Sequence, residues 1–219
     1  MNLNLNIDLI NKIVHESDFF KIHSDFYKDS DCYVIPGEHY ALFLAIASQL
    51  SNKKIIEIGT CIGHSALVFS YNSIINNNTI YTYDINSSQI NLNKLTANNI
   101  KFSTENLMNS NYRNLPHIKE HILSSDIIFI DIDPHIGLLE YEFYLFLRKE
   151  NFKGIIIFDD IYMGKQGHAF EHRKLLGHFM YENLWSKIPD YEKICVSHMG
   201  HISGTGIINF NSNNKIIIT

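Results

Sequence analysis

Acidic residues lie directly after two short apolar runs of the sequence, where they could hold a cation. The first run ends in Asp131, and the second ends in Asp159 and Asp160. If both runs are neighbouring strands of a parallel sheet, about 5 Å apart, their carboxylates meet at one edge. Neither segment contains Lys or Arg, so the carboxylates would repel one another unless a cation were present. Oxygen ligands suit Mg²⁺, Ca²⁺ or Mn²⁺, and we expect Mg²⁺. Asp159 and Asp160 could instead cap the segment that follows them.

A second signal is Glu-Ile-Gly-Thr-Cys-Ile-Gly-His-Ser-Ala at residues 57–66, where an apolar run ends in a glycine turn. Gly59 and Gly63 let the backbone pass close to a ligand, and a helix start presents free N–H groups. The next apolar run ends in Asp84, whose carboxylate could accept both hydroxyls of a ribose. The acidic residue makes this turn more informative than an ordinary loop between a strand and a helix.

The elements around these motifs follow a regular alternation. From residue 55 onward, short apolar runs alternate with longer amphipathic stretches, which predicts strand–helix units and a mainly parallel sheet. Runs that are apolar on both faces suit strands covered by helices on both sides. The expected strands are 54–58, 79–83, 100–103, 126–130 and 154–158, and the expected helices between them are 64–73, 88–98 and 137–150.

The two ends of the chain depart from this alternation. Residues 168–186 are predicted to form one long helix, and 192–196 and 206–210 two antiparallel strands that close the sheet. Before residue 55 there is no strand signal, only two helical stretches, 9–21 and 39–50, on either side of a polar turn at Ser30-Asp31. We therefore expect residues 1–50 to be an N-terminal helical cap on the same domain as residues 51–219.

The composition excludes several classes of protein. With 219 residues, 45% of them hydrophobic and 19% charged, the chain is an ordinary globular sequence. A net charge of −5 and the lack of long Lys or Arg runs disfavour nucleic acid and anionic membranes as partners. Cys32, Cys61 and Cys195 are too widely separated for a disulfide scaffold or a structural zinc site. Without a signal peptide or membrane segment, we expect a cytoplasmic protein with a small-molecule partner, which could be a homodimer.

The acidic residue followed by x-Gly-x-x-x-Gly, with Asp84 after the next strand, resembles the class I S-adenosylmethionine-dependent methyltransferases. The resemblance covers about residues 35–210. Cys61 stands where the first motif of these enzymes often has a central glycine. The O-methyltransferase branch shares this departure, and the segment of this chain resembles the pattern Glu-Ile-Gly-Thr-x-x-Gly-His-Ser-Ala of that branch. The resemblance implies an α/β Rossmann-like fold. Its mostly parallel seven-stranded sheet would be flanked by helices and end in an antiparallel hairpin.

The same resemblance implies a cofactor site for S-adenosylmethionine at the ends of three strands. Glu57, Gly59 and Gly63 would line the methionine end of the cofactor, and Asp84 would bind its ribose. Glu105 or Asn106 would lie beside the adenine, and the choice between them is open. The complete expected set of cofactor-binding residues is Glu57, Gly59, Gly63, Ser65, Asp84, Ile85, Glu105 and Asn106.

The acidic segments resemble those of the metal-dependent small-molecule O-methyltransferases, which carry an Asp after the fourth strand and an acidic pair after the fifth. This implies that their strands are parallel neighbours and that Asp131, Asp159 and Asp160 are metal ligands. Related enzymes place a Lys or His near the position of His135 to deprotonate the acceptor, which a neutral imidazole can do. Lys165 is the alternative base.

The closing hairpin lies over the acceptor pocket in this fold, so His201 could contact substrate, although residues 198–206 could equally be a plain glycine-rich turn. We expect an O-methyltransferase that acts on a hydroxyl of a small molecule, with a sugar or glycan as one candidate, assisted by a divalent cation. The alternatives are a metal-free methyltransferase or related hydroxylase of the same fold, and a non-catalytic cofactor-binding protein.

One motif competes with this interpretation. His-Ala-Phe-Glu-His at residues 168–172 matches H-x-x-E-H, the helical zinc signature of inverted metallopeptidases. Two histidines four residues apart share a face of a helix. The strand-rich cofactor pattern upstream has no role in such peptidases, and a chance match is plausible among 12 histidines. A helix with polar residues near the mouth of the site is the better interpretation.

Overall fold

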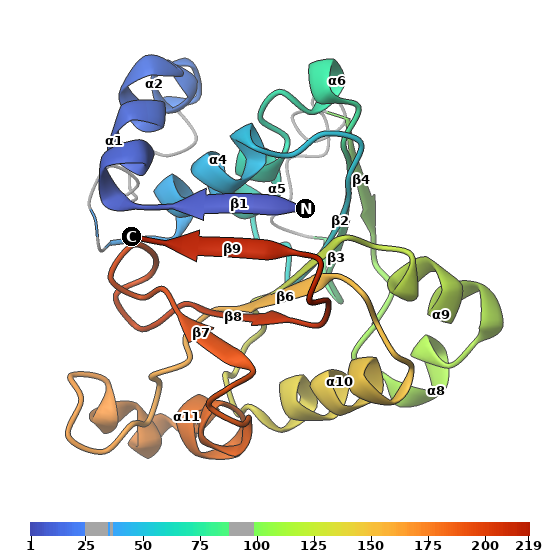
Figure 1. The fold of residues 1–219 in the computed structure, drawn as a ribbon. Helices are drawn as coiled ribbons and strands as arrows, with labels where there is room; N and C mark the ends of the chain where they lie inside the picture. The colour runs from blue at the N-terminus through green and yellow to red at the C-terminus, as the bar shows by residue number, and fades with distance from the viewer. Residues whose placement is uncertain (25–34, 36, 88–98) are drawn as a thin grey trace.

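The computed structural model describes residues 1–24, 35, 37–87 and 99–219. A seven-stranded sheet with the order β4-β3-β2-β5-β6-β8-β7 forms its centre (Figure 1). Strands β2 to β6 run parallel, whereas β8 is antiparallel to both of its neighbours, β6 and β7. The strands are β2 (Lys54–Ile58), β3 (Thr79–Tyr83), β4 (Ile100–Ser103), β5 (Ile127–Ile130), β6 (Ile155–Phe158), β7 (Lys193–Cys195) and β8 (Gly206–Asn209).

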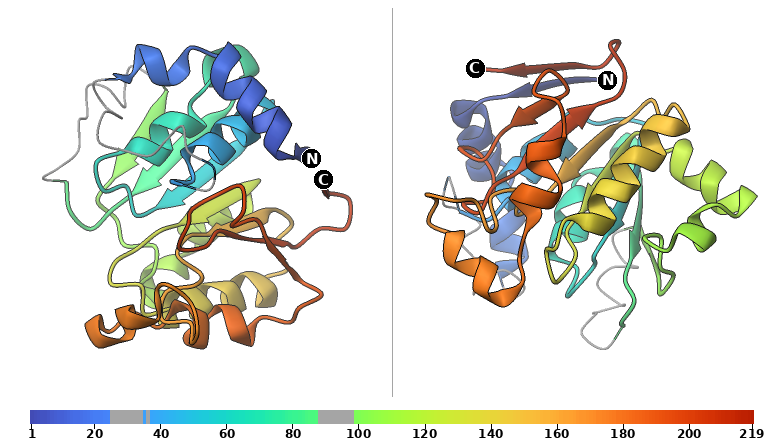
Figure 2. Two further views of the ribbon diagram at one scale, coloured as in Figure 1. Left: turned by 90° about the vertical axis from the view of Figure 1, so that its left-hand side faces the viewer. Right: turned by 90° about the horizontal axis from the view of Figure 1, so that it is seen from below.

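Alternating residues of the central strands bury their side chains in two separate cores. Ile55, Phe129 and Ile157 belong to one core, which is covered by helices α1 (Ile7–Glu16), α4 (Tyr40–Ser48) and α5 (His64–Phe69). Ile56, Ile128 and Ile156 belong to the other, covered by α9 (Pro116–Leu123), α10 (Leu138–Lys149) and α11 (Met180–Asn183). The result is a three-layer arrangement with helices on both faces of the sheet (Figure 2).

The predicted mostly parallel α/β sheet flanked by helices is confirmed, and so are all seven predicted strands. The bounds of β2, β3 and β4 are those expected from the sequence. The closing strands β7 and β8 pair antiparallel, as predicted for a hairpin that ends the sheet. Runs of Ile and Phe without polar interruption predicted β5 and β6 because strands with two covered faces need apolar residues at every position.

The prediction that no strand precedes residue 55 was wrong. Strand β1 (Asn2–Leu5) pairs in parallel with β9 (Lys215–Ile218), which joins the two ends of the chain (Figure 1). The segment Asn-Leu-Asn-Leu alternates with the period of two that is typical of a strand with one covered face. Leu3 and Leu5 are buried and Asn2 and Asn4 are exposed, so the N-terminal region is not purely helical.

The prediction of one long helix over residues 168–186 was also wrong. The structure has a 3₁₀ segment η1 (Glu171–Leu176), then α11, then a second 3₁₀ turn η2 (Trp185–Lys187). No side chain of η1 is buried, so there is no apolar stripe to hold a continuous helix against the core. Gly177 then takes a left-handed conformation with φ of 84° and ends the segment.

Most of the other predicted helices are present but shorter or divided. The stretch 9–21 is divided into α1 and α2 (Phe19–Ile22) by Asp18, whose φ is 50°. The stretch 64–73 yields α5, followed by α6 (Ser73–Asn76). Between the predicted strands 100–103 and 126–130, where no helix was expected, the structure has α8 (Ser110–Arg113) and α9. The predicted helix 88–98, the turn at Ser30-Asp31 and Cys32 lie outside the described residues.

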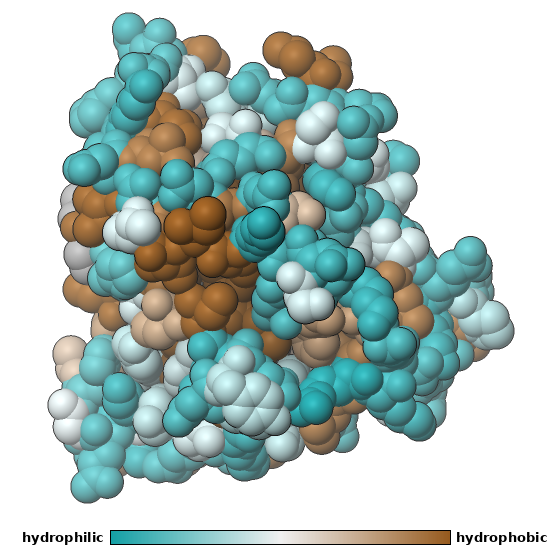
Figure 3. Space-filling model, in the orientation of Figure 1, coloured by the Kyte–Doolittle hydropathy of each residue, from teal (hydrophilic) through white to brown (hydrophobic). Residues whose placement is uncertain are grey.

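The molecular surface is mixed in character. On the face drawn in Figure 3, hydrophilic residues surround an apolar area near the centre. Within the described ranges, no helix is both long enough and apolar enough to cross a lipid bilayer.

Candidate active site

A cavity of about 520 Å³ lies at the carboxyl ends of the central strands. Ligands bind at this edge in doubly wound folds. One continuous cavity therefore joins the glycine turn after β2 to the acidic residues after β5 and β6. Its lining includes Gly59, Cys61, Asp84, Ile85, Glu105, Asn106, Asp131, Asp133, His135, Asp159 and Asp160, together with Glu38, His39, Tyr40, Leu139 and His201.

The glycine turn is shaped by its neighbouring strand. Gly59 has a φ of +101°, and a Cβ atom there would stand 1.7 Å from the carbonyl oxygen of Asp131. The sequence prediction attributed this glycine to the close approach of a ligand, whereas the structure shows that the main chain after β5 already requires it. Gly63, with φ of 92°, begins helix α5. Gly63 and Ser65 are not among the residues that line the cavity.

Glu57 is completely buried beneath the turn. Its carboxylate accepts a hydrogen bond from the Thr82 hydroxyl, and the Ser65 hydroxyl also bonds to it. Burial outweighs these hydrogen bonds and raises the pKa of Glu57 to about 7. Glu57 therefore lies buried beneath the turn and is not among the residues that line the cavity, whereas the sequence analysis expected it beside the methionine end of the cofactor.

Asp84 directly follows β3 and is hydrogen-bonded to the glycine turn. Its carboxylate accepts the Cys61 N–H at 2.8 Å and the Asn86 N–H at 3.0 Å, and it lines the cavity. Each oxygen can accept a further hydrogen bond, so the residue can still bind a hydroxylated ligand. Glu105 and Asn106 both line the cavity after β4, so the choice between them stays open.

Histidines surround the acidic pair after β6. The Nδ1 atoms of His39 and His201 lie 3.1 and 2.9 Å from Asp159 Oδ2. Burial would raise the pKa of Asp159, but the charges of these two histidines hold it well below its ordinary value. Burial also acts to lower the pKa of His201, but the charge of Asp159 and its hydrogen bond outweigh burial and raise this pKa to about 12.

Asp160 has partners of its own. His135 Nε2 lies 3.0 Å from Asp160 Oδ2 and 3.1 Å from Asp133 Oδ1, so His135 is held between two carboxylates. The Ser203 hydroxyl donates a hydrogen bond to Asp160 Oδ1. The expectation that the carboxylates lack a cationic partner was incomplete, because it considered only Lys and Arg within the two motifs. Histidines from outside those motifs supply the partners.

Asp131 differs from the other two carboxylates. Its carboxylate faces the same cavity and belongs to two of the groups of potential metal ligands. Burial, together with the charges of Asp159 and Asp160, raises the pKa of Asp131 well above its ordinary value. A positive ligand beside Asp131 would relieve this repulsion.

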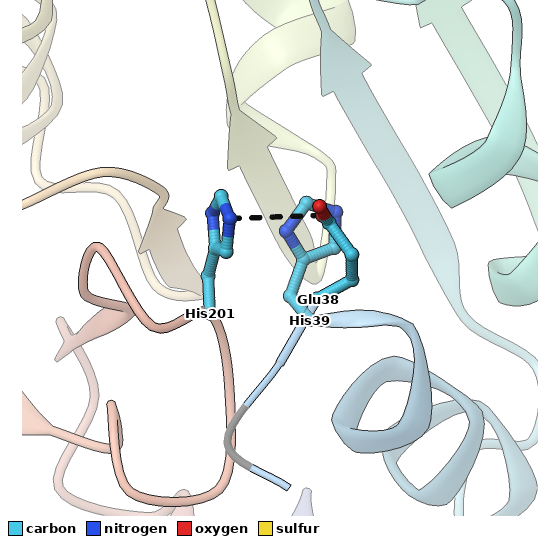
Figure 4. Close-up of side chains that lie close together, drawn as sticks. All are labelled: Glu38, His39 and His201. Carbon is cyan, nitrogen blue, oxygen red and sulfur yellow. Dashed lines mark ion pairs between the residues drawn. The ribbon is translucent and has the colours of Figure 1, made fainter. Parts of the chain in front are cut away.

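The sequence did not single out the residues that enter the site at the start of α4. Glu38, His39 and Tyr40 line the cavity, and His201 Nε2 lies 3.7 Å from Glu38 Oε2 (Figure 4). An isolated pair of polar residues before a buried helix has no recognisable spacing, because its partners are far away in the sequence. His201, which was noted as a substrate contact, reaches the cavity from the loop between β7 and β8.

Two other sequence motifs are not part of this cavity. Lys165 Nζ lies over the rings of Tyr162 and Tyr181, 4.4 and 5.1 Å from their centroids, and is not among the lining residues. In the H-x-x-E-H segment, His172 is bonded to a main-chain oxygen and Glu171 accepts the Gly167 N–H. Among the described residues, neither belongs to a group with metal-ligand spacing.

Several solved methyltransferase structures have a fold similar to that of this chain. No protein-family model and no curated protein sequence matches the chain. The SAH-bound methyltransferase PaMTH1 of Podospora anserina superposes with a TM-score of 0.53 and 13% identity, over 94% of this chain and 96% of that one. A provisionally named caffeoyl-CoA O-methyltransferase of Staphylococcus aureus superposes at 0.52 with 20% identity, over 91% of each chain. A similarly named O-methyltransferase of Klebsiella pneumoniae gives 0.52 with 14% identity, over 95% and 92%.

These similarities extend over nearly the whole chain. The fold of this chain is therefore similar, over nearly its whole length, to the fold of these three methyltransferase structures. At such low identity the similarity shows the fold and carries no information about the substrate. The chemistry must be argued from the residues of the cavity.

Proposed function

We propose that this protein is an S-adenosylmethionine-dependent O-methyltransferase that acts on a hydroxyl of a small molecule. The observation that carries the proposal is the single cavity that runs from Asp84 to the acidic pair after β6. A cofactor bound at the glycine turn would lie next to residues able to hold and deprotonate a hydroxyl group. S-adenosylmethionine, when bound, supplies an electrophilic methyl group on its sulfonium.

The residues at the cofactor end fit such a ligand. Asp84 offers carboxylate oxygens to a ribose, and Glu105 or Asn106 lies where a base would extend beyond it. Charge-assisted hydrogen bonds of the kind that Asp84 can make are about twice as strong as neutral ones. PaMTH1, which has the same fold, was solved with SAH, and this supports the assignment.

His135 is the proposed general base at the acceptor end. Its Nε2 atom lies between Asp133 and Asp160, which orient the ring and stabilise the imidazolium that forms when it takes a proton. The neighbouring lining is polar, with Glu38, Asp133 and His201 available to hydroxyl groups. This polarity supports a sugar or another polyhydroxylated acceptor.

A divalent cation is part of the proposal. Asp131, Asp159 and Asp160 are the proposed ligands, and Asp131 lies in groups with Asp159 and with Asp160 whose potential ligand atoms are within 4.8 Å of one another. The repulsion among these carboxylates supports a cation at this place. Such an ion supplies Lewis-acid polarisation of the acceptor oxygen. The chain's own part is to orient the acceptor hydroxyl next to His135.

The histidine contacts favour a second candidate, a metal-free methyltransferase. His39 and His201 already balance the charge of Asp159, and His135 balances that of Asp160. In that enzyme, His201 would donate a hydrogen bond to the acceptor and His135 would take its proton.

One assay distinguishes these candidates. The purified protein is incubated with methyl-labelled S-adenosylmethionine and a panel of sugars and phenols, with and without a strong chelator. Label in a methyl ether that disappears with chelator supports the metal-assisted enzyme. Undiminished transfer in chelator identifies the metal-free enzyme, and cofactor binding without transfer to any acceptor would support a non-catalytic cofactor-binding protein.

A further inference from the structure

The lining of the cavity carries an excess of acidic side chains. Seven carboxylates line it, and among the described residues that do so there is neither Lys nor Arg. The lining side chains that can become cationic are three histidines. The carboxylates are those of Glu38, Asp84, Glu105, Asp131, Asp133, Asp159 and Asp160, and the histidines are His39, His135 and His201. Carboxylates therefore outnumber cations in this cavity even when every histidine is protonated.

The ligands of the proposed reaction do not reverse this balance. S-adenosylmethionine carries a sulfonium, an ammonium and a carboxylate group, so it adds one net positive charge, and a divalent cation adds two. With both bound and all three histidines protonated, the positive charges are still fewer than the seven carboxylates. An acceptor with a phosphate or carboxylate group would enter against this field, whereas a cation would be attracted by it.

Glu38 is a carboxylate of the acceptor end that is only weakly paired. The Ile202 N–H donates a hydrogen bond to the Gly37 carbonyl oxygen at 2.9 Å, which holds the main chain before Glu38 against the loop between β7 and β8. The Glu38 side chain is 33% exposed, and its Oε2 atom lies 3.7 Å from His201 Nε2, beyond hydrogen-bond distance (Figure 4). Glu38 therefore offers carboxylate oxygens to a ligand in the cavity.

His201 is shared among several carboxylates. Its Nδ1 atom lies 2.9 Å from Asp159 Oδ2 and 3.3 Å from Asp160 Oδ1, so one imidazolium faces three carboxylates, with Glu38 as the third. Asp160 in turn lies 3.0 Å from His135 Nε2. This chain of contacts places Glu38 and the proposed base His135 at the same end of the cavity.

We infer that the acceptor carries a positively charged amino group in addition to its hydroxyl, and that Glu38 binds this ammonium group. An ammonium group offers three hydrogen-bond donors to the oxygens of Glu38, and hydrogen bonds between two charged groups are strong. Amino sugars and phenolic amines are acceptors of this chemistry, whereas phosphorylated and carboxylated acceptors are not. The inference rests on the proposed function, because it names the class of acceptor for that same site.

Two sets of acceptors that share a scaffold and differ in charge test the inference. Glucosamine, N-acetylglucosamine and glucose phosphate form the sugar set, and tyramine, ethylphenol and hydroxyphenylacetate form the phenol set. Transfer from methyl-labelled S-adenosylmethionine is measured at neutral pH with Mg²⁺ present throughout, so that the amine and the divalent cation are tested together. In the set that is methylated, we expect the kcat/KM of the amine to exceed that of the neutral member by about tenfold or more, with the acidic member lowest.

Ionic strength gives a readout that needs no variant. Raising the salt concentration from about 0.05 to about 0.5 M should reduce the preference for the amine over the neutral member, because partly exposed charges are screened. A preference that arises from the shape of the acceptor alone would not change with salt.

Glu38→Gln tests the assigned residue. The amide keeps the size of the side chain but not its charge, so the ratio of kcat/KM for the amine to that for the neutral member should fall about tenfold. A merely structural role would lower kcat/KM for both members alike and leave this ratio unchanged. Glu16→Gln, at an exposed position of α1, is the matched control and should keep the wild-type ratio. Circular dichroism checks that both variants fold.

Specific outcomes would overturn the inference. A neutral or acidic member that is methylated as efficiently as the amine, or an unchanged ratio in Glu38→Gln, would show that Glu38 does not select a cation. If no member is methylated, calorimetric titration with glucosamine and tyramine in the presence of SAH decides. Binding that Glu38→Gln weakens supports the inference, and absence of binding rejects it.

The same samples separate this inference from the proposed function. SAH binding together with transfer to neutral or acidic acceptors in preference to amines rejects this inference alone. Amine binding that depends on Glu38, without SAH binding, rejects the proposed methyltransferase alone.

Discussion

The buried residue Glu57, beneath the glycine turn, makes the stability of the folded protein depend on pH. Burial raises its pKa to about 7, from an ordinary value of 4.5. The folded protein therefore holds this proton more tightly than the unfolded chain does. The stabilisation that results is complete below about pH 4.5 and is lost as the pH rises through 7.

Glu57→Gln should remove this pH dependence, because the amide stays neutral. Between pH 5 and pH 8 we expect the free energy of unfolding of the wild type to fall relative to that of the variant by up to about 3 kcal/mol. Denaturant titrations of the ligand-free proteins at several pH values measure the difference. Glu16→Gln, on an exposed part of α1, is the control and should follow the wild type. Parallel pH profiles for Glu57→Gln and wild type would rule out a buried, proton-binding Glu57.

His135 is the residue with the most specific expected role in turnover. His135→Ala should lower the rate of methyl transfer by about 10²–10⁴-fold, the usual contribution of a positioned acid or base, and leave SAH affinity unchanged. Lys165→Ala is the comparison, since Lys165 lies over two tyrosine rings outside the cavity lining. Single-turnover assays and calorimetry measure both variants. A large loss with Lys165→Ala and little with His135→Ala would reverse the assignment of the base.

At the scale of elements, the turn between β2 and α5 depends on the strand beside it. A Cβ on Gly59 would meet the main chain of Asp131, and its φ of +101° disfavours any other residue. Gly59→Ala should therefore destabilise the protein by several kcal/mol, at least about 3, and abolish SAH binding. Gly167→Ala is a matched control, because Gly167 also has a positive φ, of +74°, but apart from its chain neighbours no atom of the described residues lies within 4 Å of its Cβ position.

Thermal unfolding and SAH titration of the two glycine variants provide the measurement. Gly167→Ala should cost only about 1 kcal/mol, the conformational penalty without the collision. Equal stability of the two variants would mean that the β5 main chain does not constrain the turn.

Elements that depend on local pattern were predicted well, and those that depend on distant partners were not. Strand β2 is mostly apolar and is followed directly by Gly59, so its bounds follow from the sequence alone. Residues 171–176 have helical spacing but no buried side chain, so no packing against the core holds them in a continuous α-helix. The same limit applies to the site. Asp131, Asp159 and Asp160 follow strands and were predicted, whereas His39 reaches Asp159 across 120 positions of the chain.

At the scale of the whole molecule, the parallel pair β1 and β9 joins the two termini over the core that contains α1 and α4 (Figure 1). Leu5 is fully buried there, on the other side of the strand from Asn4. Leu5→Ala should lower the free energy of unfolding by about 2–5 kcal/mol, the usual cost of such a truncation in a core. Asn2→Ala, at an exposed position of the same strand, should change it by less than about 0.5 kcal/mol.

Denaturant unfolding of these two variants measures the contribution of the terminal pair. SAH affinity below the unfolding transition should be unaffected in both, because neither residue lines the cavity. A Leu5→Ala protein as stable as the wild type would show that β1 is not part of the cooperative fold.

Asp84 is the residue through which the cavity from the glycine turn to the acidic residues is proposed to bind S-adenosylmethionine. Calorimetric titration with SAH, in the wild type and in Asp84→Asn, tests it most directly. We predict one site in the wild type and an affinity lower by about 1–3 kcal/mol in the variant, with no binding of ATP or NAD. Asp190→Asn, an exposed surface carboxylate, should bind like the wild type. Absence of SAH binding to the wild type, or equal affinity in Asp84→Asn, would contradict the account.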